Sequence, residues 1–211
     1  MLEINKVHCW DCLELMKLIP DKSIDLVLTD PPYGIGIDWQ KESISNNPKH
    51  NRKAHEFMWW DDNIPSKQYF NEIFRVSKNQ IIRWWNYFVM YLTEWHKWWI
   101  VWDKWQHWLT MSDCELAYSS FDKPTRVFVK NRVEIQVDWA VHPTQKPVDL
   151  FKWILENYSE KWMTILDPFL WSWTTAVACK EMGRNWIGIE KEQKYVDIAN
   201  KRLENTTISL F

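Results

Sequence analysis

Two short stretches combine carboxylates, prolines and aromatic rings in a way that suits chemistry on a small molecule. The first is Asp30-Pro31-Pro32-Tyr33, which follows the apolar run at residues 26–28. Such a run is typical of a buried strand in a parallel sheet, and prolines end it because they have no N–H for the ladder. A carboxylate, a rigid carbonyl and an aromatic ring therefore meet at the carboxyl end of a strand, where open α/β sheets bind ligands.

The second stretch is residues 167–176, which read Asp-Pro-Phe-Leu-Trp-Ser-Trp-Thr-Thr-Ala, where a predicted strand turns into a helix. Glu190 ends the strand that follows this helix. A strand, loop and helix with an acid closing the next strand is the layout of nucleoside-binding sites, in which the acid accepts hydrogen bonds from ribose hydroxyls.

Four motifs in one order resemble the DNA amino-methyltransferases that use S-adenosylmethionine. In that family Asp-Pro-Pro-Tyr holds the target amine and Asp-Pro-Phe-x-Gly-x-Gly-Thr-Thr binds the cofactor. Residues 142–147, His-Pro-Thr-Gln-Lys-Pro, are similar to the segment before the family's cofactor strand. Trp10-Asp11-Cys12 is similar to its Gly-Asp-Cys, whose Asp lies near the adenine of the cofactor. The catalytic motif comes first and the cofactor motif last, which is the circularly permuted order of the β class.

The resemblance implies a set of site residues. The expected catalytic residues are Asp30, Pro31, Pro32 and Tyr33. The expected cofactor-binding residues are Asp11, Lys146, Asp167, Phe169, Trp171, Ser172, Trp173, Thr174, Thr175 and Glu190. Two alternatives stay open: Lys146 as a solvated lysine at a helix start, and the two threonines as helix caps. No metal is expected, because Cys9 and Cys12 form a lone C-x-x-C without a second pair.

The reaction implied is transfer of a methyl group from S-adenosylmethionine to the N6 of an adenine flipped out of duplex DNA. The sequence has no Pro-Cys dipeptide of the kind used in C5-cytosine methylation, and Asp rather than Ser begins the catalytic motif, as in N6-adenine enzymes. The alternatives are N4-cytosine methylation, methylation of an RNA adenine or a protein glutamine, and a non-catalytic nucleic-acid-binding relic.

The composition departs from the usual in one respect. The chain has 18 Trp and 4 Gly, whereas usual glycine content would give roughly 15. Tryptophan stands where glycine is expected at Trp10, Trp84, Trp85, Trp105, Trp139, Trp162, Trp171 and Trp173. Because glycine serves where φ is positive or backbone approaches a ligand, we hypothesise that many of these residues are glycine in the working protein. In some bacterial lineages one stop codon is reassigned to glycine, and in others to tryptophan. Translating the gene with the wrong genetic code would replace glycine by tryptophan.

The elements that must position these residues follow from hydrophobic periodicity. Strands are predicted near residues 7–9, 25–29, 80–82, 99–102, 163–167 and 186–190, and helices near 13–19, 67–74, 148–158, 174–182 and 195–203. Residues 115–120 and 126–130 are predicted to form an antiparallel pair at the sheet edge. The fold class is therefore α/β, a Rossmann-like methyltransferase fold with a mostly parallel sheet and an antiparallel edge.

Length and charge bound the remaining expectations. The 211 residues suit a single methyltransferase domain, 1–211, with a flexible loop at about 34–63 and a short target-recognition region at about 86–139. The net charge of -2 gives no overall basic field, so contact with DNA must be local. With no signal peptide and no run of membrane-spanning length, a cytoplasmic protein is expected. The expected partners are double-stranded DNA and a cognate restriction endonuclease, with the chain as monomer or homodimer.

Overall fold

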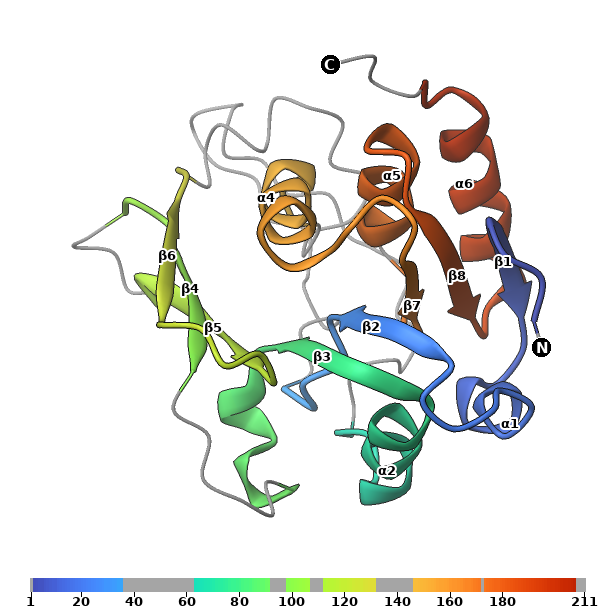
Figure 1. Cartoon of the computed structure of the whole chain (residues 1–211), viewed down its shortest axis with the longest axis horizontal. Coiled ribbons are helices and arrows are strands. Elements are labelled where there is room, and N and C mark those ends of the chain that lie inside the picture. Colours follow the sequence, from blue (N-terminus) through green and yellow to red (C-terminus); the bar gives the residue numbers. More distant parts are fainter. Residues whose placement is uncertain are drawn as a thin grey trace, which may run out of the picture.

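A twisted sheet forms the centre of the molecule (Figure 1). The computed structural model describes residues 2–35, 63–91, 98–106, 112–131, 146–171 and 173–207. Over these ranges the strands are β1 (Lys6–Cys9), β2 (Ile24–Thr29), β3 (Ser77–Arg83), β4 (Trp99–Asp103), β5 (Cys114–Ser119), β6 (Arg126–Val129), β7 (Thr164–Asp167) and β8 (Asn185–Glu190). They form one sheet in the order β1-β8-β7-β2-β3-β5-β4-β6. The first five strands in this order are parallel, so their carboxyl ends share one edge.

Helices cover both faces of the sheet (Figure 1). They are α1 (Cys12–Met16), α2 (Lys67–Val76), α4 (Val148–Tyr158), α5 (Thr174–Glu181) and α6 (Gln193–Glu204), with the short 3-10 helices η3 (Trp85–Tyr87) and η4 (Val89–Tyr91). The α4–α6 side packs on Leu26 and Leu28 of β2, while the α1–α2 side packs on Val27. Because strand side chains alternate between faces, this burial on both faces explains the unbroken apolar run.

The predicted fold class is confirmed, but the predicted antiparallel pair is wrong. β5 is antiparallel to β3 on one side and to β4 on the other. β6 instead pairs in parallel with β4, at the outer edge of the sheet. Both hydrogen-bonding sides of β5 are thus taken, which leaves β6 only the free side of β4. Alternation along a strand identifies a strand and its buried face, and it carries no information on which strand lies next to it.

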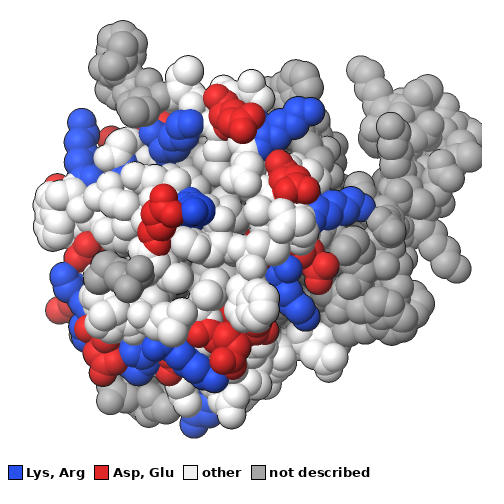
Figure 2. All heavy atoms as spheres, turned by 90° about the vertical axis from the view of Figure 1, so that its right-hand side faces the viewer, with Lys and Arg blue, Asp and Glu red and all other residues white. Residues whose placement is uncertain are grey.

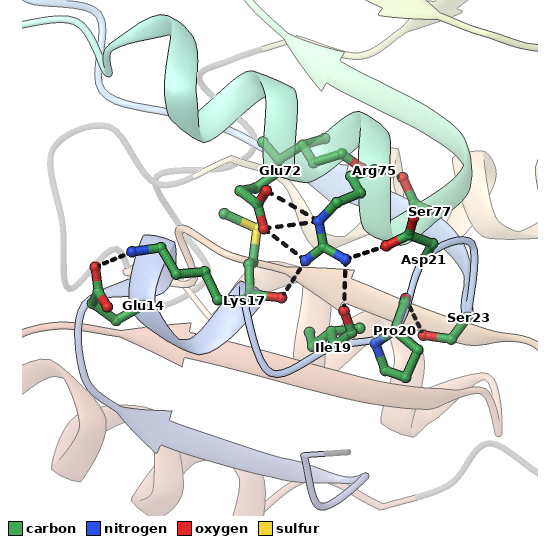
Figure 3. A network of polar contacts seen from close by, with 11 residues as sticks. Glu14, Lys17, Ile19, Pro20, Asp21, Ser23, Glu72, Arg75 and Ser77 are labelled. Atoms are coloured by element: carbon green, nitrogen blue, oxygen red, sulfur yellow. Dashed lines mark hydrogen bonds and ion pairs between the residues drawn. The ribbon is translucent and has the colours of Figure 1, made fainter.

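A polar network joins α2 to the connection between α1 and β2 (Figure 3). The Arg75 guanidinium donates to the backbone carbonyl oxygens of Met16 at 2.8 Å and Ile19 at 2.9 Å. It also pairs with the carboxylates of Glu72 at 2.6 Å and Asp21 at 2.5 Å. The Met16 carbonyl, at the end of α1, and the Ile19 carbonyl beyond it thus both accept hydrogen bonds from Arg75. These bonds hold the chain that leads into β2 against α2.

The face turned to the viewer in Figure 2 carries acidic and basic side chains interspersed over its described residues. Neither sign forms a continuous patch there, and this face offers no distinct electrostatic surface for a polyanion. None of the helices in the described ranges combines the length and apolar character that a membrane span requires.

Candidate active site

Acidic residues follow four neighbouring parallel strands at one edge of the sheet. Asp11 comes two residues after β1, Glu190 ends β8, Asp167 ends β7 and Asp30 follows β2. These strands lie side by side in the order β1-β8-β7-β2. The structure therefore brings together carboxylates from both ends of the sequence, at the edge where the sequence placed them.

Asp30 is buried and only partly satisfied. Its Oδ1 accepts a hydrogen bond from the Tyr33 hydroxyl, and its backbone carbonyl accepts one from Trp171 Nε1 at 3.1 Å. Its Oδ2 has no hydrogen-bond donor, and the nearest cation is Lys146 Nζ at 3.7 Å. Because buried carboxylate oxygens are normally hydrogen-bonded, Oδ2 is an acceptor without its donor.

Asp167 has both carboxylate oxygens bonded within the fold. Oδ1 accepts from Thr29 Oγ1 at 2.7 Å and from the Phe169 amide at 3.1 Å, and Oδ2 accepts from Thr175 Oγ1 at 2.6 Å. Burial raises the pKa of Asp167 to about 6, although these hydrogen bonds oppose the rise. Asp167 thus ties β2, β7 and α5 together behind the site, and the Thr175 hydroxyl is engaged with this carboxylate.

A cavity of about 460 Å³ opens beside these strand ends. Asp11, Phe169 and Glu190 line it, together with Pro32 and Trp171. The remaining lining residues come from the chain after β1, the start of α2 and the turn after β8: Trp10, Cys12, Asn63, Ile64, Pro65, Ser66, Tyr69, Pro168, Ile189, Lys191, Glu192 and Tyr195. The volume lies within the range of small-molecule sites.

Two of the lining carboxylates, Asp11 and Glu190, end or follow strands of the sheet. Asp11 caps α1 by accepting from the Leu13 amide at 2.8 Å, and its Oδ2 accepts from the Tyr69 hydroxyl at 3.3 Å. Glu190 accepts from the Glu192 amide at 2.8 Å through Oε1. Burial raises the pKa of Glu190 to about 7. A carboxylate in this buried position can accept hydrogen bonds from the hydroxyl groups of a ligand. The apolar Phe169 and Ile189 side chains suit contact with a flat ring.

Lys146 belongs to a buried cluster of charges behind Tyr33. Its Nζ lies 3.5 Å from Glu115, whose carboxylate also pairs with Arg83 and, at 3.2 Å, with Lys104. Burial raises the pKa of Glu115, but the charges of Lys146, Arg83 and Lys104 outweigh it and hold this pKa below its usual value. The solvated-lysine alternative for Lys146 is therefore wrong, since its side chain is only 7% exposed.

The predicted cofactor-loop residues divide into two groups. Trp171 lines the cavity and reaches the Asp30 carbonyl. Trp173 is buried in the core with its ring under the Arg202 guanidinium, 5.7 Å from the ring centroid, and Thr174 is buried at the start of α5. Neither of these two lines the cavity. Ser172 and residues 142–145 lie outside the described residues, as do Trp139 and most of the 34–63 loop.

The backbone supports the glycine hypothesis at three positions. Trp84, Trp105 and Trp173 have φ of 50°, 48° and 45°, in the left-handed region that favours glycine. The indole nitrogens of Trp84 and Trp173 are also buried without a hydrogen-bond partner. Trp10, Trp162 and Trp171 have no such backbone, and the first two are more than 60% exposed, so sequence resemblance alone argues for glycine there.

Sequence reasoning missed Thr29, Arg83 and Glu115. Thr29 anchors Asp167, and Glu115 joins the cations around Asp30. Arg83 carried a partial signal, because it directly follows the predicted strand 80–82. Only the structure shows that this strand lies next to β2 and brings Arg83 to the same edge. Glu115 carried none, since it begins an antiparallel strand whose neighbours only the tertiary structure reveals.

Comparisons with known proteins agree with this arrangement. A sequence profile of the N6/N4 family, described as DNA methylase, matches residues 39–201. The chain is 27% identical over 247 residues to the type II methyltransferase M.HinfI of Haemophilus influenzae, covering 95% of this chain and 68% of that protein.

Two solved structures share the fold. The M1.HpyAVI–SAM complex has a TM-score of 0.64 at 22% identity, covering 93% of this chain and 98% of that one. PvuII DNA methyltransferase, which is cytosine-N4-specific, has a TM-score of 0.58 at 15% identity, covering 97% and 94%. Since the profile matches well over half of the chain, the protein belongs to the N6/N4 family of DNA methylases.

Proposed function

We propose that this chain transfers a methyl group from S-adenosylmethionine to the N6 of adenine in double-stranded DNA. The observation that supports this proposal best is Asp30 Oδ2, a buried carboxylate oxygen without a donor, beside the cavity at the carboxyl edge of the sheet. An exocyclic amine carries the N–H group that this oxygen lacks.

Asp30 and Pro31 would activate the target amine by holding its two N–H groups in hydrogen bonds. The lone pair of an exocyclic amine is delocalised into its ring, which makes the nitrogen a poor nucleophile. Acceptors that bind both N–H groups away from the ring plane turn this lone pair outward. Oδ2 of Asp30 would accept one N–H and the Pro31 carbonyl the other, with the prolines fixing where that carbonyl points.

Tyr33 would hold the ring of the flipped base. Its hydroxyl already donates to Asp30, which fixes the phenol relative to the acceptor oxygen. Stacking of a base on an aromatic ring is worth about 1–3 kcal/mol. This offsets much of the few kcal/mol that extrusion of the base from the duplex requires.

The cavity suits the nucleoside end of the cofactor. Glu190 would accept ribose hydroxyls, Asp11 would lie near the adenine, and Phe169 would contact the adenine ring. S-adenosylmethionine, when bound, supplies the electrophilic methyl group. The path from this cavity to Asp30 crosses Trp171, whose indole touches both, so the methionine end fits only when this residue is small.

The remaining assignments are proposals of the same kind. The further cofactor contacts of Lys146, Ser172, Thr174 and Thr175 follow from the resemblance. The single domain 1–211 follows from the chain length, and target recognition by residues 86–139 from the order of the motifs. Contact of residues 41–55 with phosphate follows from the cations of that stretch, Lys41, Lys49, Arg52 and Lys53. A cognate restriction endonuclease and a cytoplasmic location also follow from the resemblance, through the type II relatives.

The product identifies the substrate. Unmethylated genomic DNA is incubated with methyl-labelled S-adenosylmethionine and the chain that carries glycine at 171 and 173. The DNA is then digested to nucleosides and examined by mass spectrometry. We expect label in N6-methyladenine. Label in N4-methylcytosine alone would contradict the base assignment and leave the amine chemistry intact, whereas label only in added protein would contradict both.

A further inference from the structure

Residue 84 follows β3 directly, at the same edge of the sheet as Asp30. β3 pairs in parallel with β2, with Ile82 opposite Thr29. Trp84 adopts φ 50° and ψ 34°, which is left-handed backbone. An L-residue is strained in this conformation, which glycine adopts freely. The chain therefore bears local strain at a position that neighbours the catalytic motif.

The indole of Trp84 lies against one side of Tyr33. The two ring centroids are 5.2 Å apart with the planes tilted by 46°, and Tyr87 stacks at 5.7 Å. As a result Tyr33 is only 3% exposed. A base that stacks on Tyr33 with its amine on Asp30 Oδ2 needs one of these rings to be absent.

Cations surround the same indole. Lys104 Nζ and Lys146 Nζ each lie 5.2 Å from the centroid of the Trp84 ring. The indole nitrogen is buried without a hydrogen-bond partner, so its polar atom is not satisfied by these surroundings. An aromatic ring, two ammonium groups and a carboxylate oxygen without a donor are groups that recognise a nitrogen heterocycle with an exocyclic amine.

We propose that residue 84 is the wall of the acceptor-base subsite and that the subsite opens when this residue is glycine. The proposal rests on the proposed function in one respect, that Asp30 holds the target amine. An indole and a purine are both a six-membered ring fused to a five-membered ring, so the space that the Trp84 side chain leaves has the size of adenine. A single-ring cytosine fills it only in part. Lys104 and Lys146 then lie over the face of the purine ring, as they lie over the indole, and make cation–π contacts with it. Residue 84 in this way sets the preference for adenine.

The first test asks whether the space binds a purine, independently of catalysis. Trp84→Gly is compared with Trp105→Gly, because Trp105 also has left-handed backbone, with φ of 48°, but is 65% exposed. Tyrosine rings are labelled with ¹³C, and the Tyr33 signal is assigned through Tyr33→Phe. We expect millimolar adenine to shift this signal in Trp84→Gly and not in Trp105→Gly, with cytosine binding about tenfold more weakly.

Trp84→Ala separates the cavity from the backbone, because it opens the same space and keeps a Cβ at positive φ. It is expected to bind adenine as Trp84→Gly does. An unperturbed Tyr33 signal in Trp84→Gly, or the same shift in Trp105→Gly, would overturn the subsite.

The second test measures catalysis in a chain with glycine at 171 and 173. Adding Trp84→Gly should raise kcat on DNA by about tenfold or more, with the Kd of S-adenosylmethionine unchanged. Trp162→Gly, at a side chain that is 66% exposed and outside the cavity, should alter neither. Equal transfer with and without Trp84→Gly would contradict the proposal. Adenine binding at Tyr33 without any methyl transfer would instead leave the subsite standing and contradict the proposed function.

Discussion

Asp30 differs from the other acids of the site because its Oδ2 meets a cation, Lys146, without accepting a hydrogen bond. Asp167 is bonded to two hydroxyls and an amide, and Asp11 to two amides and a hydroxyl. Only Asp30, among the acids at the described strand ends, has a buried oxygen without a donor. This difference separates the residue proposed to meet the substrate from those that hold the fold or the cofactor.

Asp30→Ala is expected to abolish methyl transfer and to leave cofactor affinity within about threefold, because the residue does not line the cavity. Transfer is measured with labelled S-adenosylmethionine on adenine-containing duplex, and affinity by calorimetry, both in the chain with glycine at 171 and 173. Asp30→Asn keeps the shape and loses an acceptor, and should be equally inactive. Near-normal transfer by either variant would remove Asp30 from the mechanism.

At the scale of elements, the loop between β7 and α5 decides whether the cofactor fits. In this loop Trp171 stands between the cavity and Asp30, and Trp173 begins α5 with left-handed backbone. Trp171 is a steric obstacle to the cofactor, whereas Trp173 strains the backbone. We therefore expect Trp171 to affect cofactor affinity and Trp173 to affect stability. A loop that joins a strand to a helix at the ligand edge usually needs small residues for close approach of its backbone.

Glycine at both 171 and 173 should strengthen S-adenosylmethionine binding by at least about thirtyfold, because overpacking typically costs about 1–3 kcal/mol per site. Calorimetry on the chain as written and on the double variant measures this change. Trp162→Gly is the control, since Trp162 is 66% exposed and lies outside the cavity. Equal micromolar binding by both chains would show that the loop tolerates indoles.

A second prediction at this scale concerns the Arg75 network (Figure 3). Arg75→Met removes the Arg75 donor of the Ile19 carbonyl and one of two donors of the Met16 carbonyl, which keeps its bond from the Ile19 amide. It should lower the free energy of unfolding by about 2 kcal/mol. Lys78→Met, which breaks the half-exposed pair with Asp25, should lower it by less than about 1 kcal/mol. Urea unfolding followed by circular dichroism measures both. A similar loss in the two variants would mean that the network is no more than a surface ion pair.

At the scale of the whole molecule, the proposed role of Glu190 in cofactor binding makes both folding and binding depend on whether its carboxyl is protonated. Burial raises its pKa from 4.5 to about 7, so the folded protein favours the protonated acid. This contribution to stability is complete below about pH 4.5 and is lost as the pH rises through 7. Ribose hydroxyls donate to the ionised form, so cofactor binding should release the proton that folding retains.

Cofactor affinity is therefore expected to rise by up to about tenfold per pH unit below pH 7 and to level off above it. Glu190→Gln should remove most of this dependence, bind less tightly at pH 8, and gain stability relative to the parent as the pH rises from 5 to 8. Calorimetry in buffers of different ionisation enthalpy counts the released proton, in the chain with glycine at 171 and 173. Glu204→Gln at the end of α6 is the control. Unchanged pH dependence in Glu190→Gln would assign the proton elsewhere.

The sequence by itself determined the elements and the family. Periodicity located β2, α4 and β8 closely, because a buried strand and an amphipathic helix leave local patterns in the order of apolar residues. The two motifs placed Asp30, Asp167 and Glu190 at strand ends, and the parallel sheet brings such ends to one edge whatever their distance along the chain.

Only the tertiary structure decided how these residues are used. Local sequence patterns do not show which strands pair, so the partners of β5 and β6 could not be predicted. For the same reason the position of Glu115 among three cations could not be predicted. The same holds for Trp84, which the sequence marks as unusual and the structure places on Tyr33. Periodicity depends on near neighbours, whereas a buried charge or a filled pocket depends on residues that meet only when the sheet assembles.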